Sequence, residues 1–196
     1  MIRTKAEVAC LLLDRAIWQY FHGDDLAVVH NMAHAAHTVL RDVAKASHAD
    51  RHFEARLFAS LKAQGVVMPD GSALESHRQF ADFMNAQANG LKHADRERGD
   101  LSIEPEPIQA AMALGCSHAV QLGIVTRAQI VCLVWIARRS NAAPDLLQDT
   151  PMARAFEGLN TMGREEALEV GAKFLCADGI NTTAPFTCPR HATAPF

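Results

Sequence analysis

Apolar residues recur every three or four positions along most of this chain, which is the period of an amphipathic α-helix. The first such stretch follows Thr4 and Glu7, whose spacing is that of a capping box at a helix N-terminus. One face of this helix carries the apolar residues Val8, Leu11, Leu12, Ala16 and Tyr20. We expect the helix to end at His22 and Gly23, because glycine favours helix termination.

A second, longer helix is predicted to begin after Asp24 or Asp25, since either side chain can cap it. Its apolar residues alternate three- and four-residue spacings, at Leu26, Val29, Ala33, Ala36, Leu40 and Val43. This pattern indicates a helix that packs centrally or pairs with another helix.

The same criteria predict helices over 51–64, from Ser76 to about residue 91, and over 106–122, 126–139, 151–160 and 163–177. Thr126 is expected to cap the helix over 126–139, which should bury Ile130, Val134 and Ile136 or their neighbours. The short connection LGIVT favours antiparallel packing of this helix on the one before it. The predicted fold is therefore all-α, an antiparallel bundle of about six to eight helices.

The chain divides into three predicted parts. Residues 1–148 form a helical core domain, and residues 149–178 add C-terminal helices that pack on the core. Residues 179–196 are rich in turn formers and lack a helical period, so we expect an irregular tail.

Composition narrows the class of protein. The formal net charge of −3 provides no overall basic field, so any nucleic-acid binding must use a local patch. Five cysteines, an odd number without a CxxC pair, are typical of reduced thiols in the cytoplasm. The longest uncharged apolar run, 128–137, is too short to span a bilayer. We therefore expect a cytoplasmic protein without a membrane span and without a required cofactor.

A stripe of polar side chains lies along the second predicted helix, at His30, His34, His37, Arg41 and His48. At about 100° per residue they share a sector at the edge of the core. Histidines one helical turn apart can chelate one ion, so His30, His34 and His37 are candidate ligands for zinc or a similar divalent metal. Another helix would supply the remaining ligand, with candidates His22, Asp24, Asp25, His93, Asp95 and His118. Two alternatives stay open: hydrogen-bonded imidazoles at a core boundary, or an acid–base or anion-binding set.

A second polar cluster is NGLKHADRERGD, residues 89–100. If the helix that starts near Ser76 continues through Gly90, then Asn89, His93 and Arg96 share its solvent-facing side. His93 could then act as an acid or base on a ribose hydroxyl, while Lys92 or Arg96 stabilises charge on a phosphate. The alternative is a charged helix end whose cations compensate the helix dipole.

The segment NGLKHADRERGDLSIEPE resembles the NFFKHADRDPD segment of a family of bacterial helical proteins, and the resemblance extends over roughly residues 5–148. That family is HEPN-like. The resemblance implies a small antiparallel helical domain that forms a homodimer, and active members are metal-independent ribonucleases with an Arg-x4–6-His motif. In those members a polar residue, commonly asparagine, follows the arginine. Asn89 and His93 match these two positions, whereas Ala88 occupies the place of the arginine.

Three functional hypotheses follow from these clusters. The chain is an RNA- or nucleotide-phosphate-directed protein using His93, Arg96, Asn89 and Lys92, or a divalent-metal-binding protein using His30, His34 and His37. The third hypothesis is an interaction module with a protein partner encoded nearby, in which both clusters only decorate helices.

Overall fold

The computed structural model describes residues 2–47, 68, 71–92, 102–139 and 154–176, together with 55, 58–59 and 62–63. Its α-helices in these ranges are α1 (Lys5–Phe21), α2 (Leu26–Ala46), α4 (His77–Lys92), α5 (Pro105–Gln121), α6 (Arg127–Arg139) and α8 (Arg164–Cys176). The predicted all-α fold is confirmed. The predicted helix over 51–64 and the predicted tail 179–196 lie largely or wholly outside the described residues.

Local capping interactions set the ends of the first two helices. The Thr4 N–H donates to the Glu7 carboxylate at 2.7 Å, and the Glu7 N–H donates to Thr4 Oγ1 at 3.2 Å, which completes the predicted capping box. Asp25, rather than Asp24, caps α2 by accepting from the N–H groups of Ala27 and Val28. Both helices therefore begin where short-range hydrogen bonds can satisfy their free N–H groups.

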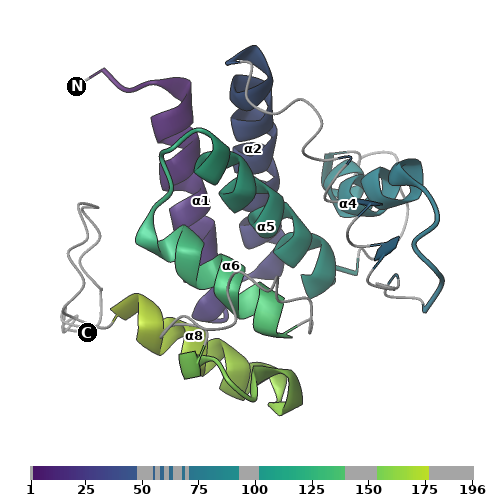
Figure 1. Ribbon diagram of the computed structural model, residues 1–196, viewed down its shortest axis with the longest axis vertical. Helices are drawn as coiled ribbons and strands as arrows, with labels where there is room; N and C mark the ends of the chain where they lie inside the picture. Colours follow the sequence, from purple (N-terminus) through teal and green to yellow (C-terminus); the bar gives the residue numbers. More distant parts are fainter. Residues whose placement is uncertain are drawn as a thin grey trace.

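Helix α2 packs closely against both α1 and α5 (Figure 1). Small residues allow this close packing. A Cβ on Gly115 of α5 would lie 3.0 Å from Leu13 Cδ2 and 3.6 Å from His37 Cα. The buried positions of α2 include Val29, Ala33 and Leu40 from the predicted apolar set. The prediction that this helix packs centrally or pairs with another helix is thus confirmed by its pairing with α1 and α5.

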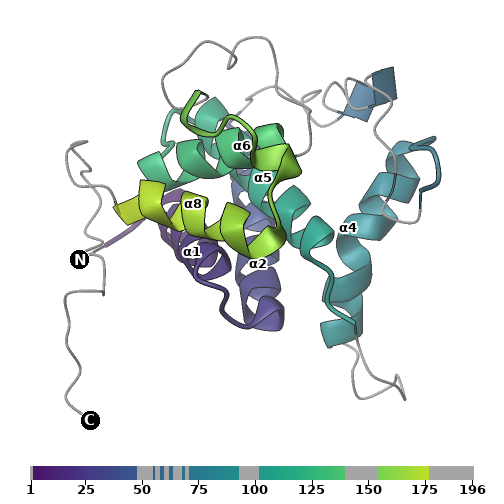
Figure 2. The ribbon, with the colours of Figure 1, turned by 90° about the horizontal axis from the view of Figure 1, so that it is seen from below.

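Helix α8 packs across the C-terminal end of α1 and beside α6 (Figures 1 and 2). Trp135 of α6 is the main contact at this junction, with 1% of its surface exposed. Its indole N–H donates to the Ala167 carbonyl at 2.7 Å, and its ring meets those of Tyr20 and Phe21 edge-on. The C-terminal helix is therefore part of the same hydrophobic core as α1 and α6.

Two details of the predicted helices differ from the structure. Helix α6 buries Val134, as predicted, but Ile130 is 41% exposed and its neighbours Val131 and Cys132 are buried, together with Trp135, because α6 is covered by α1 and α5 on one side and α8 on another. The predicted helix over 151–160 is too long: in its described part, 154–155 are α-helical, 156–158 form a turn, and a 3₁₀-helix (Leu159–Thr161) follows. Gly158 adopts a left-handed φ of 81°, which an α-helix cannot accommodate.

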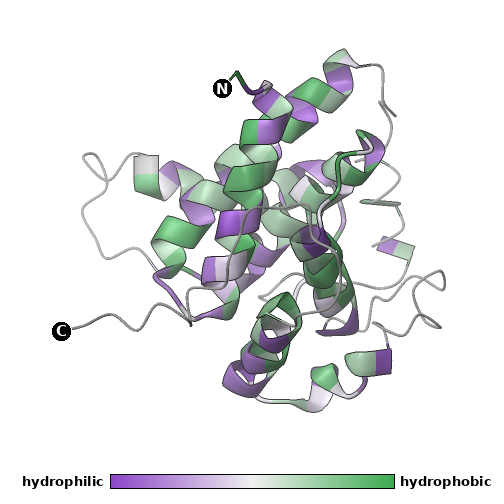
Figure 3. Ribbon diagram, turned by 90° about the vertical axis from the view of Figure 1, so that its left-hand side faces the viewer, coloured by the Kyte–Doolittle hydropathy of each residue, from purple (hydrophilic) through white to green (hydrophobic). Residues whose placement is uncertain are grey.

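Three cysteines are buried in the helical core. Cys10, Cys116 and Cys132 are free thiols, and burial raises the pKa of the Cys10 and Cys116 thiols. In the part of the chain described here, no helix is long and apolar enough to cross a membrane. Hydrophobic and hydrophilic residues alternate along the helices, as expected for amphipathic helices around a shared core (Figure 3).

Gly171 is expected to tolerate no side chain. A Cβ at this position of α8 would overlap the ring of Phe21, so Gly171→Ala should lower the free energy of unfolding by about 1–3 kcal/mol despite alanine's better helix propensity. Urea denaturation followed by circular dichroism measures the change. Gly163→Ala is the matched control, because a Cβ there meets nothing within 4 Å. Equal stability of the two variants would show that α8 packs less closely than described.

Candidate functional site

The histidine stripe lies where α2 meets α4 and α5. The ring centroids of His30 and His34 are 5.9 Å apart, and those of His34 and His37 are 6.4 Å apart. His118 of α5 continues the series, with its ring stacked on that of His37 at 5.6 Å. Four imidazoles thus form one row, which includes His118 from the predicted set of additional ligands.

Two of these histidines lie deeper than the predicted edge of the core. His30 is 0% exposed and His37 is 6% exposed, whereas His34 is partly exposed. The prediction was wrong because α2 is covered on this side as well, by α4 and α5. Burial, with a smaller contribution from the nearby His34, lowers the pKa of His30 to about 4. His30 is therefore neutral at physiological pH.

One observation favours a metal site at the histidine stripe, and another does not. Among the described residues, neither ring nitrogen of His30 has a hydrogen-bond partner, which is unusual for buried nitrogens. However, no three His, Cys, Asp or Glu side chains in the described ranges are arranged to hold one metal ion. Of the other predicted ligands, His22 stacks on Trp18 at 3.9 Å, while His93 and Asp95 lie outside the described residues.

The second predicted cluster begins on α4. This helix continues through Gly90 to Lys92, and Asn89 is exposed on it, as the predicted polar face requires. Met84 and Ala88 are buried on the other side of the helix. Lys92 is the last residue of α4, and the predicted site residues His93 and Arg96 lie outside the described residues.

A hydrogen bond between side chains connects the two clusters. His34 Nε2 lies 3.0 Å from Asn85 Oδ1, and the Asn85 amide in turn donates to the Ala81 carbonyl at 2.7 Å. Asn85 precedes Asn89 by one helical turn, so both lie along the same side of α4. Sequence reasoning missed this contact, because a pair 51 residues apart leaves no local signal.

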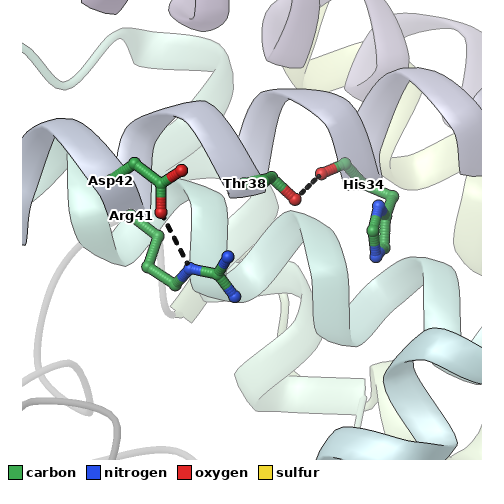
Figure 4. A network of polar contacts seen from close by, with 4 residues as sticks. All are labelled: His34, Thr38, Arg41 and Asp42. Carbon is green, nitrogen blue, oxygen red and sulfur yellow. Dashed lines mark hydrogen bonds and ion pairs between the residues drawn. The ribbon is translucent and has the colours of Figure 1, made fainter.

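Arg41 extends the polar side of α2 beyond His34 (Figure 4). Its guanidinium Nε lies 3.4 Å from Asp42 Oδ1, and its side chain is 32% exposed. Thr38, between Arg41 and His34, donates its hydroxyl to the His34 carbonyl at 2.9 Å. Arg41 therefore lies on the same side as the stripe, as predicted, while His48 is outside the described residues.

A buried carboxyl group holds the N-terminus of α6. Asp14 of α1 accepts hydrogen bonds from Thr126 Oγ1 at 2.7 Å and from Gln129 Nε2 at 2.9 Å. Thr126 also caps α6, since it accepts from the Gln129 N–H, as predicted. Burial raises the pKa of Asp14 to about 6, and the two hydrogen bonds partly oppose that rise. In the sequence, Asp14 is recognisable only as an acidic residue within an apolar helix pattern, so its contact with α6 was not predicted.

Comparison with known proteins identifies no relative of this chain. No family model matches it. Neither the curated proteins nor the solved structures contain a significant match.

Proposed function

We propose that the chain is a HEPN-like helical binding module directed at the phosphate groups of RNA or nucleotides. The binding surface is the side of α2 and α4 that carries His34, Asn85 and Asn89. The supporting observation is the 3.0 Å hydrogen bond between His34 and Asn85, which joins the histidine stripe to the helix that leads into the segment NGLKHADR. The two polar clusters then act as one surface.

The end of α4 needs cations if it is to bind an anion. A helix C-terminus carries a partial negative charge, which repels phosphate unless basic side chains neutralise it. Lys92 is the last residue of α4, and His93 and Arg96 follow it closely in the sequence. In the proposal, Lys92 and Arg96 contact phosphate, His93 contacts a ribose hydroxyl, and Asn89 orients His93.

Ala88 favours binding over cleavage. It occupies the place of the arginine in the motif of HEPN-like ribonucleases, and it is only 2% exposed. A buried position of this kind has no room for a long cationic side chain without an opposing charge. We therefore propose that the surface binds phosphate and serves as an interaction module, without requiring catalysis.

Fluorescence anisotropy with a short labelled single-stranded RNA tests the proposal. Combining Lys92→Ala, His93→Ala and Arg96→Ala should weaken binding about tenfold or more and reduce the salt slope by roughly 1.4, because two phosphate contacts are lost. Arg78→Ala is the control, since Arg78 lies in the first turn of the same helix, its side chain is 91% exposed, and it pairs with Asp82. An equal loss in both variants, or no saturable binding by the parent, contradicts the proposal. Cleavage that disappears with His93→Ala would instead indicate a nuclease.

The second candidate function is divalent-metal binding by His30, His34 and His37. It is favoured by the unpartnered ring nitrogens of the buried His30 and by the contact of His118 with His37. This candidate predicts that zinc raises the melting temperature and that His30→Gln abolishes the rise. His77→Ala, which changes an exposed histidine on α4, should leave the rise intact. Purified protein with less than about a tenth of an equivalent of metal, and no shift on adding zinc, would exclude it.

A further inference from the structure

An apolar groove runs between the N-terminal half of α1 and the C-terminal half of α2. Its volume is about 420 Å³, within the roughly 300–1,000 Å³ of ligand-binding pockets. The buried alanines Ala9 and Ala36 lie at its floor. Val8 and Leu12 on one side, with Val39 on the other, form its aliphatic walls.

The walls have the spacing of helix-packing ridges. Val8 and Leu12 are four residues apart on α1, and Ala35 and Val39 are four residues apart on α2. Two such ridges with small residues between them leave a channel into which the side chains of a third helix can pack. Val8 is 52% exposed, so this wall is not covered by the residues of the chain that the structure describes.

The charges at one end of the groove have a single sign. Arg3 and Lys5 line it where α1 begins, and they are the charged residues among its described lining. The nearby Glu7 carboxylate is already bound by the N–H and hydroxyl of Thr4, which with Arg3 lowers the pKa of Glu7. The groove therefore presents an aliphatic channel with a cationic end.

We propose that this groove binds an amphipathic helix of a protein partner, with an aliphatic stripe along one face and acidic residues in its first turn. Aliphatic anchors at i, i+3, i+4 and i+7 are the usual way in which a helix occupies such a groove. Acidic residues in the first turn complement Arg3 and Lys5 and also stabilise the partner's own helix. The occupant is thus defined by both shape and charge.

This surface is separate from the proposed phosphate-binding side. At 100° per residue, Ala35 and Val39 lie almost opposite His30, His34 and His37 around α2. In agreement, α1 and α4 lie on different sides of α2 (Figure 1). One partner can therefore occupy the groove while the α2–α4 side stays accessible, and each proposal can fail without the other.

Two synthetic helical peptides of roughly 18 residues test the inference by fluorescence anisotropy. Both carry leucines at the anchor spacing, with glutamates in the first turn of one and lysines in the other. The full-length chain should bind the glutamate peptide about tenfold more tightly, and combining Arg3→Ala with Lys5→Ala, or adding salt, should remove that preference. Val8→Ser should weaken binding of both peptides about fivefold, because it removes apolar contact.

Val120→Ser is the matched control, since Val120 of α5 is 51% exposed and lies outside the groove. It should leave peptide binding unchanged, as should the combined Lys92, His93 and Arg96 variant. Equal effects of Val8→Ser and Val120→Ser, no preference for glutamate, or no saturable binding would overturn the inference. A fall in molar mass on Val8→Ser, measured by light scattering, would also overturn it by showing that a second copy covers the groove.

Discussion

Replacing Trp135 with alanine is expected to lower the free energy of unfolding by about 3–5 kcal/mol. Trp135 is 1% exposed, contacts the rings of Tyr20 and Phe21, and donates to the Ala167 carbonyl. The alanine variant therefore loses apolar burial in the core and the hydrogen bond that attaches α6 to α8. Urea denaturation monitored by circular dichroism measures the change.

Two further variants separate the causes of this loss. Trp135→Phe keeps an aromatic ring but removes the indole N–H, so it should cost only about 1–3 kcal/mol from the unpaired Ala167 carbonyl and the smaller ring. Trp18→Ala alters the other tryptophan, which is half-buried on the outer side of α1 between Arg15 and His22. If Trp18→Ala were as destabilising as Trp135→Ala, the described position of Trp135 in the core would be wrong.

Asp14→Asn and a His30→Leu substitution are expected to change the pH dependence of stability in opposite directions. The pKa of Asp14 is raised from 3.8 to about 6. Its contribution to the free energy of unfolding is therefore fully present below pH 3.8 and is lost as the pH rises through 6. The pKa of His30 is lowered from 6.5 to about 4, so its contribution is present above pH 6.5 and is lost as the pH falls through 4. Each amounts to about 3 kcal/mol, at roughly 1.4 kcal/mol per pH unit.

Between pH 4 and 6 these two contributions oppose each other in the parent protein. Asp14→Asn removes the contribution that falls as the pH rises, so the free energy of unfolding of this variant should increase with pH more steeply than that of the parent. His30→Leu removes the rising contribution of His30 to the free energy of unfolding, so the slope of stability against pH should be more negative in this variant than in the parent. Urea denaturation at several pH values measures both. Parallel profiles for the parent and the two variants would show that neither group is buried as described.

The local part of the fold was predictable from the sequence. The beginnings of α1, α2 and α6 follow from Thr4, Asp25 and Thr126, which hydrogen-bond N–H groups two or three residues away. Predictions that needed a neighbouring helix were less accurate. Ile130 fits the helical pattern as well as Val131 does, and only the positions of α1, α5 and α8 around α6 decide which of them is buried.

The candidate site, like the fold, was predictable only in its local features. A shared side for His30, His34 and His37 follows from helical geometry, as does an exposed Asn89 once α4 continues through Gly90. The depth of His30 and His37 does not follow from it, because a helical period is the same whether one side or both sides of the helix are covered. The contact of Asn85 with His34 was likewise not predictable.

The sequence by itself determined an all-α chain, most of its helix boundaries and the histidine stripe, because these depend on interactions within a few residues. Only the tertiary structure decided that His118 joins the stripe, that Asp14 anchors α6, and that an apolar groove lies between α1 and α2. Such features depend on which helices meet and at what distance. That choice reflects the packing of many side chains together, and no short segment of sequence encodes it.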